Sequence, residues 1–165
     1  MKQILAEEDL KSLAVYYCSQ RETSVAKLKL YLKRKLTEQD LDEPLWIEKT
    51  LQYCIEKKLV DDRRYSEMLT REYIRQKRGK FDITRKLKQK GLELPDDEET
   101  QIQLSEDEEL SRAIELCKKL LLRGNTFSEL EPFKLRQKLL QRLVARGYSL
   151  NIGKKAVDVA LKEQD

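Results

Sequence analysis

The chain has 165 residues, and its 34 Lys or Arg against 30 Asp or Glu give a formal net charge of +4. Charged residues make up 39% of it while Gly and Pro number only 5 and 3, which favours a mostly helical fold with short loops. Histidine is absent, so the commonest general base and the commonest zinc ligand are missing.

The three cysteines, Cys18, Cys54 and Cys117, form no CxxC pair and lie among apolar residues at helical spacing. This pattern favours buried, reduced thiols over a disulfide framework or a catalytic thiol. No apolar run approaches the roughly 20 residues of a membrane helix, and the first ten residues lack the apolar core of a signal peptide. We therefore expect a soluble, cytoplasmic monomer without metal or cofactor.

In the first third of the chain, apolar spacing predicts helices over about 8–20, 25–35 and 42–58. Thr23 or Ser24 is placed to cap the second helix, because a short hydroxyl accepts hydrogen bonds from the free amides of a first turn.

In the middle third, Asp61 or Asp62 is placed to cap a helix whose inner face is predicted to be Tyr65, Met68, Leu69 and Tyr73. A turn at Gly79 leads to a short helix over 82–90, with Ile83 and Leu87 inward and Gly91 at its end. A weaker pattern predicts a third helix over 96–104, anchored by Ile102 and Leu104.

In the last third, Ser105 and Glu108 have the spacing of a capping box, and the apolar residues that follow predict a helix that begins there. Leu135, Leu139 and Leu143 stand four residues apart and predict a second helix that runs to Gly147. Ser149 is placed to cap a last helix that ends near Lys162.

The middle helices of the three thirds align with one another. Three sets of positions coincide: Leu28, Ile83 and Leu139; Leu32, Leu87 and Leu143; Leu36, Gly91 and Gly147. The residue before the third set is basic each time, as Lys35, Lys90 and Arg146. We therefore predict an all-α fold of three tandem three-helix repeats, over 1–58, 59–104 and 105–165, which stack to bury faces that one repeat cannot bury alone.

Positive charge gathers in the middle third. Residues 57–92 hold 13 Lys or Arg against 5 Asp or Glu, a net charge of +8, while residues 93–109 hold nine acids and no base. A solvated helix face is the simpler interpretation, but charges segregated in this way, beside a glycine turn, favour a nucleic-acid or nucleoprotein surface. The candidate binding residues are Arg63, Arg64, Lys77, Arg78, Lys80, Arg85, Lys86, Lys88 and Lys90, and the candidate structural motif is Asp61, Asp62, Gly79, Gly91 and Gly147.

Two features of the middle third have two interpretations each. Tyr65, Tyr73 and Phe81 could stack on bases, but their helical spacing favours the core. The acidic segment 93–109 is either a solvated linker or a competitor of DNA for the basic face.

Three stretches carry a resemblance to a known family: YYCSQRETSVAKLKLYLKRKL, KLVDDRRYSEMLTREYIRQKRGKFDITRKLKQKGL and KLLQRLVARGYSLNIGKKAV. The order of an Asp-Asp segment, an Arg with an aromatic residue, a Gly turn and a short helix ending Lys-Gly-Leu resembles RecX, the bacterial modulators of the RecA recombinase. The resemblance implies an elongated, curved array of three-helix bundles. It also implies binding along a RecA–single-stranded-DNA filament, usually with inhibition of ATP hydrolysis and strand exchange.

Two other functions fit the sequence, a helical DNA-binding module without recombinase specificity and a helical scaffold that binds only proteins. A DNA-binding module would prefer some duplexes over others, and a pure scaffold would ignore DNA at any salt concentration. An enzyme is disfavoured, since the sequence has no glycine-rich phosphate loop, metal-ligand cluster or paired nucleophile and base.

Overall fold

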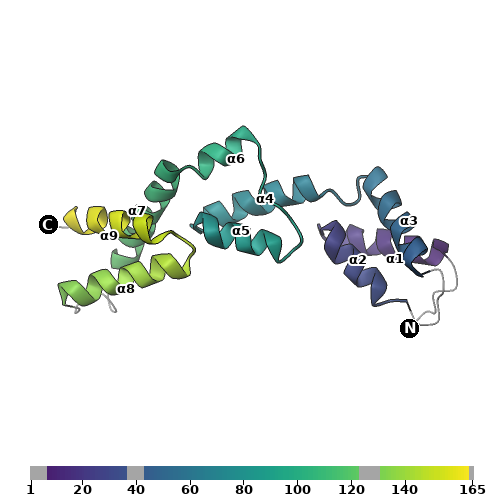
Figure 1. Cartoon of the computed structure of the whole chain (residues 1–165), viewed down its shortest axis with the longest axis horizontal. Coiled ribbons are helices and arrows are strands. Elements are labelled where there is room, and N and C mark those ends of the chain that lie inside the picture. Colours follow the sequence, from purple (N-terminus) through teal and green to yellow (C-terminus); the bar gives the residue numbers. More distant parts are fainter. Residues whose placement is uncertain (1–6, 37–42, 123–130, 164–165) are drawn as a thin grey trace. The chain divides into compact units, whose positions relative to one another are not determined.

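A computed structural model describes residues 7–36, 43–122 and 131–163, and all regular structure within them is helical (Figure 1). The helices are α1 (Glu7–Gln20), α2 (Val25–Lys33), α3 (Glu43–Glu56), α4 (Asp62–Arg75), α5 (Lys80–Lys88), α6 (Glu98–Gln103), α7 (Glu106–Leu122), α8 (Pro132–Ala145) and α9 (Leu150–Lys162). The predicted all-α class is confirmed. None of these helices has the length and apolar character needed to cross a bilayer.

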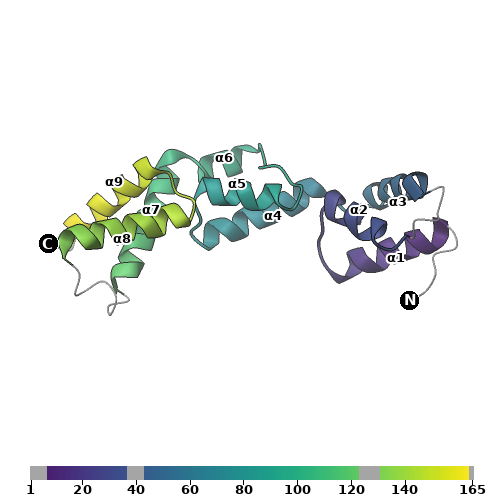
Figure 2. The same ribbon diagram turned by 60° about the horizontal axis from the view of Figure 1, so that its bottom comes forward.

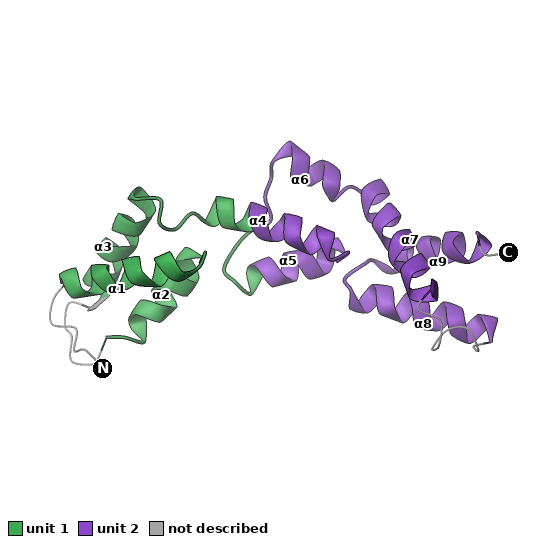
Figure 3. Ribbon diagram, turned by 180° about the vertical axis from the view of Figure 1, so that it is seen from behind, with its two compact units in different colours: residues 1–66, 88–93 green, residues 67–87, 94–165 purple. Residues whose placement is uncertain are grey.

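The chain forms two compact units (Figure 3). Unit 1 comprises residues 1–66 and 88–93, and unit 2 comprises residues 67–87 and 94–165. The division passes through α4 and the end of α5. The boundaries of the three predicted repeats, and the curvature of their array, stay predictions.

In unit 1, helices α1, α2 and α3 pack against one another (Figure 2). Their core is a single apolar cluster of Leu10, Ala14, Leu28, Leu32, Ile47, Leu51, Cys54 and Val60. Leu28 and Leu32 are fully buried, as their four-residue spacing predicts, and each such side chain contributes about 1.5–3 kcal/mol.

In unit 2, helices α7, α8 and α9 form a second group of three, and α6 packs against α7. Their core contains Ala113, Leu116, Cys117, Leu139, Leu143, Tyr148, Ile152, Ala156, Val157 and Ala160. Cys54 and Cys117 are buried, Cys18 is half-buried, and all three thiols are free, as the sequence predicts.

The N-terminal end of α2 is held by residues from elsewhere in unit 1. Ser24 caps the helix by accepting from the Lys27 amide at 3.3 Å, and its hydroxyl donates to the Lys90 carbonyl. The Val25 amide donates to the Asp62 carboxylate at 2.8 Å. Gly91, with φ +72°, lies so close to α2 that an added Cβ would stand 2.4 Å from the Ala26 Cβ.

The N-terminal end of α5 is held in the same way within unit 2. The Gly79 amide donates to the Arg146 carbonyl at 2.9 Å, and the Lys80 amide donates to the Glu109 carboxylate at 2.7 Å. Gly147, with φ +87°, lies against Asp82, where an added Cβ would stand 2.3 Å from the Asp82 amide nitrogen.

These two junctions match position by position under the alignment found in the sequence. Lys90 and Arg146 are aligned residues. The Lys90 carbonyl accepts from Ser24, the residue just before α2, and the Arg146 carbonyl accepts from Gly79, the residue just before α5. Gly91 and Gly147 are aligned as well, and each has the left-handed backbone that only glycine adopts without strain. The glycines are therefore required where one middle helix meets the next.

Two helix ends take a left-handed residue other than glycine. Lys58, after α3, has φ 54°, and Lys77, after α4, has φ 55°. At both ends the next amide returns to a carbonyl of the last turn, from Leu59 to Cys54 at 2.9 Å and from Arg78 to Tyr73 at 3.1 Å. These bonds satisfy carbonyls that a helix end leaves free.

Two residues predicted to face inward do not. Met68 is 41% exposed and Ile102 is 59% exposed. Helix α6 is shorter than predicted, because Asp97 is its N-cap and accepts from the Thr100 amide at 2.8 Å. Leu104, the residue just after α6, is buried, but this six-residue helix has no second apolar side that would pack against the core.

Candidate nucleic-acid interface

Helix α5 has one buried side and one basic side. Ile83 and Leu87 are buried as predicted, while Lys80, Phe81 and Arg85 are exposed and form what we call the α5 face. Phe81 is 68% exposed, so its predicted place in the core is wrong. The reason is geometric, because residue 81 is about 200° around the helix from Ile83. An exposed ring between cations can stack on a base, since every base has a π face.

Asp82 organises the arginines beside this face. Its side chain is 1% exposed and accepts from Arg78 at 2.5 Å and from Arg85. Burial acts to raise the pKa of Asp82, but the hydrogen bonds from Arg78 and Arg85 outweigh it, and the pKa lies below its ordinary value. Both arginines are thus partly neutralised, and their positions are fixed by a buried carboxylate.

The Tyr73 ring lies near two cations, Arg78 and Lys86. The Arg78 guanidinium lies 5.9 Å and the Lys86 ammonium 5.8 Å from its ring centroid, distances at which a cation is attracted to a ring. Tyr73 and Tyr65 are half-buried and buried respectively, as the sequence favoured. Phe81 is therefore the ring of the three that is open to a ligand.

Other predicted basic residues are engaged in ion pairs. Lys77 pairs with Glu115, and Arg64 pairs with Glu22 at 2.9 Å. Arg63 and Lys88 are exposed, and Lys90 is half-buried.

The predicted residues divide between the two units. Lys77, Arg78, Lys80, Arg85 and Lys86 belong to unit 2, and Arg63, Arg64, Lys88 and Lys90 belong to unit 1. Within unit 2, Lys80, Arg85 and Lys86 lie on α5 and Arg78 is joined to that helix through Asp82, while in unit 1 Lys88 is the last residue of α5 and Arg63 and Arg64 lie on α4.

The predicted structural motif takes specific positions. Asp61 accepts from the Arg64 amide at 2.9 Å and so caps α4, whereas Asp62 reaches the first amide of α2. Burial raises the pKa of Asp62, the Val25 amide lowers it, and the Asp61 charge raises it again, with a net rise. Gly79 allows close approach, since an added Cβ would stand 2.3 Å from the Gly147 carbonyl.

Glu109 is a residue whose role sequence reasoning missed. It was counted in the acidic segment, yet it is 6% exposed and its carboxylate holds the first amide of α5. A signal was present, because Glu109, Arg112 and Leu116 stand at i, i+3 and i+7 on the buried side of α7. Arg112 is also buried and donates to the Gln103 carbonyl at 2.5 Å.

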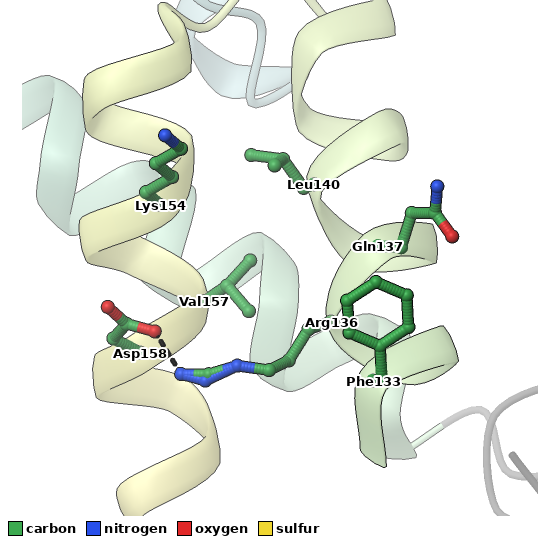
Figure 4. A pocket seen from close by; sticks show the side chains of 7 residues that line it. All are labelled: Phe133, Arg136, Gln137, Leu140, Lys154, Val157 and Asp158. Carbon is green, nitrogen blue, oxygen red and sulfur yellow. Dashed lines mark hydrogen bonds and ion pairs between the residues drawn. The ribbon is translucent and has the colours of Figure 1, made fainter. Parts of the chain in front are cut away.

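A second surface feature is a groove between α8 and α9 (Figure 4). Its volume is about 410 Å³, and it is lined by Phe133, Arg136, Gln137, Leu140, Lys154, Val157 and Asp158. The Arg136–Asp158 ion pair crosses it at one end, as Figure 4 shows. Phe133 at its edge is 76% exposed. The groove shares no residue with the basic face predicted from the sequence.

Within residues 7–36, 43–122 and 131–163, no three His, Cys, Asp or Glu side chains are grouped so as to hold a metal ion. The features that stand out are instead basic helix faces on a frame of short helices. The fold and these faces define the class of protein, an all-α protein with a repeated helix junction and exposed basic helix faces.

Known proteins fall into the same class. The RecX model for the second three-helix domain matches residues 61–94. The Regulatory protein RecX of Halalkalibacterium halodurans is 30% identical over 174 residues, and that of Lactococcus lactis subsp. cremoris (strain MG1363) is 29% identical over 170. Each match covers 100% of this chain and 61% of the relative.

A solved structure agrees in fold. The crystal structure of RecX from Lactobacillus salivarius superposes with a TM-score of 0.72 at 20% identity, over 95% of each chain. The chain is therefore similar to RecX proteins along its whole length, as the resemblance in its sequence indicated. Because this chain spans only 61% of the two relatives in sequence, the activity of a whole relative comes to it only as a proposal.

Proposed function

We propose that the chain binds a RecA–single-stranded-DNA filament in the cytoplasm and modulates, mostly by inhibition, its ATP hydrolysis and strand exchange. The similarity to RecX proteins supports the target. The observation that carries the contact is the α5 face, where Phe81 is 68% exposed beside Lys80 and Arg85. It lies in the segment that the RecX domain model matches. A ring flanked by cations is the arrangement with which proteins hold single strands.

The mechanism follows from linked, weak contacts. The predicted basic residues are divided between both units, and linkage raises the effective concentration of a second contact once the first has formed. A monomer that touches several filament protomers hinders the protomer movements that accompany ATP turnover. Such an effect needs no catalytic group on this chain.

The test is single-stranded-DNA-dependent ATP hydrolysis by the cognate RecA, titrated with this protein. The variant is Lys80→Gln with Phe81→Ser, which leaves the Arg78–Asp82–Arg85 cluster intact. A matched control is Lys134→Gln with Phe133→Ser, an exposed pair of the same types on α8. We expect inhibition by the wild-type protein well below the concentration of RecA, about 5- to 100-fold weaker inhibition by the α5 variant, and no change in the control.

Equal inhibition by both variants would keep the function and place the contact on other residues. No inhibition by the wild-type protein would contradict the proposal, and intact DNA binding would then leave a helical DNA-binding module.

A further inference from the structure

Helix α2, in unit 1, has a solvent side that is more basic than the α5 face. We call Lys27, Lys29, Lys33 and Arg34 the α2 basic surface. Lys29, Lys33 and Arg34 are exposed, Lys27 is half-buried, and Leu30 between them is 50% exposed. Leu28 and Leu32 point to the core on the opposite side, so the four cations cannot turn inward. From Arg21 to Leu36 the sequence has six bases and one acid, Glu22.

No carboxylate of the described residues pairs with any of these four cations. The single acid of the stretch, Glu22, is engaged with Arg64 at 2.9 Å. This contrasts with unit 2, where Lys77, Arg78 and Arg85 each have a carboxylate partner. Within the described residues, the charge of the α2 basic surface is therefore not neutralised by an ion pair.

Helix electrostatics explains only part of this surface. A helix stabilises cations at its C-terminal end, where Lys33 and Arg34 lie, and opposes them in its first turn, where Lys27 lies. The first turn of α2 contains no acid. Lys29 and Lys33, four residues apart, also repel each other along one side of the helix. Lys27 and Lys29 are thus placed against the preference of an isolated helix, as expected where a bound anion compensates them.

Lys27 has a second cation beside it. Burial lowers the pKa of Lys27, and the neighbouring Lys90 ammonium lowers it further. Two ammonium groups in contact form a point of concentrated positive charge, which one phosphate could neutralise.

Two further cations, Arg21 and Lys35, border this surface, and each lies over one ring of a stacked tyrosine pair. Tyr17 and Tyr31 stack with centroids 4.0 Å apart, Arg21 lies 5.4 Å from the Tyr17 ring, and Lys35 lies 5.6 Å from the Tyr31 ring. Cations cover the outer faces of both rings, so the stacked tyrosines hold positive charges in place and leave no ring face on which a base could stack. The contact it favours is with a backbone, independent of base sequence.

We propose that the α2 basic surface binds the phosphodiester backbone of nucleic acid, with Lys90 beside it, as a contact additional to the α5 face. This inference rests on the proposed function, since it names a second DNA contact for the same protein. An acidic protein surface is the weaker match, because lysine is depleted at protein–protein interfaces and Leu30 is the one exposed large apolar residue of the described α2.

The test is binding of the free protein, without RecA, to a labelled oligothymidylate and to a labelled duplex, measured by fluorescence anisotropy over a series of salt concentrations. The variant is Lys27→Gln, Lys29→Gln and Lys33→Gln, which keeps good helix formers. The control, Lys49→Gln, Lys57→Gln and Lys118→Gln, removes the same charge from exposed positions of α3, its end and α7. Circular dichroism checks that both variants keep their helices.

We expect the variant to bind the oligothymidylate about tenfold or more weakly at low salt, and its slope of log affinity against log salt to fall by about 2, because each lost phosphate contact on a single strand removes about 0.7. The control should stay within about twofold of the wild type. An equal or larger loss on the duplex would support the surface and assign it to double-stranded DNA.

Unchanged binding by the variant, or equal losses in variant and control, would overturn the inference. So would a variant that binds DNA normally but no longer inhibits RecA, since the surface would then contact protein. A wild-type chain that inhibits RecA but binds no free DNA would overturn this inference and leave the proposed function standing.

Discussion

Helices α2 and α5 are alike in length and burial and differ in charge. Each has nine residues, and the aligned pairs Leu28–Leu32 and Ile83–Leu87 are buried. Under the same alignment Lys27 stands where α5 has Asp82. In α5 that acid is buried and draws in Arg78 and Arg85, whereas in α2 the cation leaves its basic neighbours without a carboxylate among the described residues. The buried acid of α5 therefore holds Arg78 and Arg85 against the fold, and α2 has no acid at the aligned position.

The same comparison holds for the turns that meet these helices. Gly91 faces the Ala26 side chain at the start of α2, whereas Gly147 faces both backbone and side chain of Asp82 at the start of α5. The α5 junction is the tighter, because main-chain atoms cannot rotate away as a side chain can.

The largest expected effect is that of Gly147→Ala. Its Cβ would stand 2.3 Å from the Asp82 amide nitrogen, and its φ of +87° strains any residue with a side chain. We expect a loss of about 2–5 kcal/mol in the free energy of unfolding, measured with urea. Gly91→Ala should cost less. The control is Gly153→Ala, within α9. Its added Cβ would have one close contact, with the flexible end of the Leu140 side chain at 2.7 Å. Equal losses in all three would contradict the role of the junction.

The second effect is that of Asp82→Asn, which leaves Arg78 and Arg85 without their shared charge. Breaking a buried ion pair costs about 3–5 kcal/mol, but the Arg85 side chain is 66% exposed, so we expect about 1–3 kcal/mol. The measurement is again urea unfolding at neutral pH. Glu106→Gln, which breaks the exposed pair with Lys155, is the control and should change stability by about 0–1 kcal/mol. A similar loss in both variants would argue against a special role for Asp82.

The third effect is a dependence on acid. The pKa of Asp82 in the folded chain lies below its ordinary value of 3.8. The stability it contributes is therefore fully present above pH 3.8 and is lost as pH falls through the lower, folded pKa. Urea midpoints of the wild type and Asp82→Asn should differ at pH 7 and converge below about pH 4. A constant difference down to pH 3 would show that the lost contribution is not that of the charge.

The smallest effect is that of Lys27→Asp, which gives α2 the acid that α5 has. An acid in the first turn suits the helix dipole and can pair with Lys90, so we expect a gain of about 0.3–1 kcal/mol. Lys33→Asp, at the opposite end of α2, should lose a similar amount, and thermal unfolding can compare the two. A loss in both would mean that α2 stability is not governed by its dipole.

The sequence predicted the helices well and the use of their charges poorly. The pairs Leu28–Leu32, Ile83–Leu87 and Leu139–Leu143 each have the four-residue spacing of one helix face, and all six side chains are buried. The sequence also predicts helix ends at Gly91 and Gly147, and both glycines have the left-handed backbone of a helix end. Such features depend on neighbours along the chain, which a single sequence displays.

The candidate site depends on residues far apart in the sequence. Nothing near Lys80 announces that Glu109 will hold its amide, and nothing in the count of 13 bases separates Arg85, which has a buried partner, from Lys80, which is exposed. Helical spacing favours the core for Phe81, but its angle of about 200° to Ile83 around the helix, also available from the sequence, places it on the exposed side.

Lys58 and Lys77 are positions at which a substitution could increase the free energy of unfolding. A left-handed backbone costs a residue with a side chain about 1–2 kcal/mol, which glycine does not lose, and yet lysine ends both α3 and α4. Selection for the most stable chain would favour glycine at both positions. Natural proteins are rarely at their stability optimum, so Lys58→Gly and Lys77→Gly are natural starting points for a more stable variant.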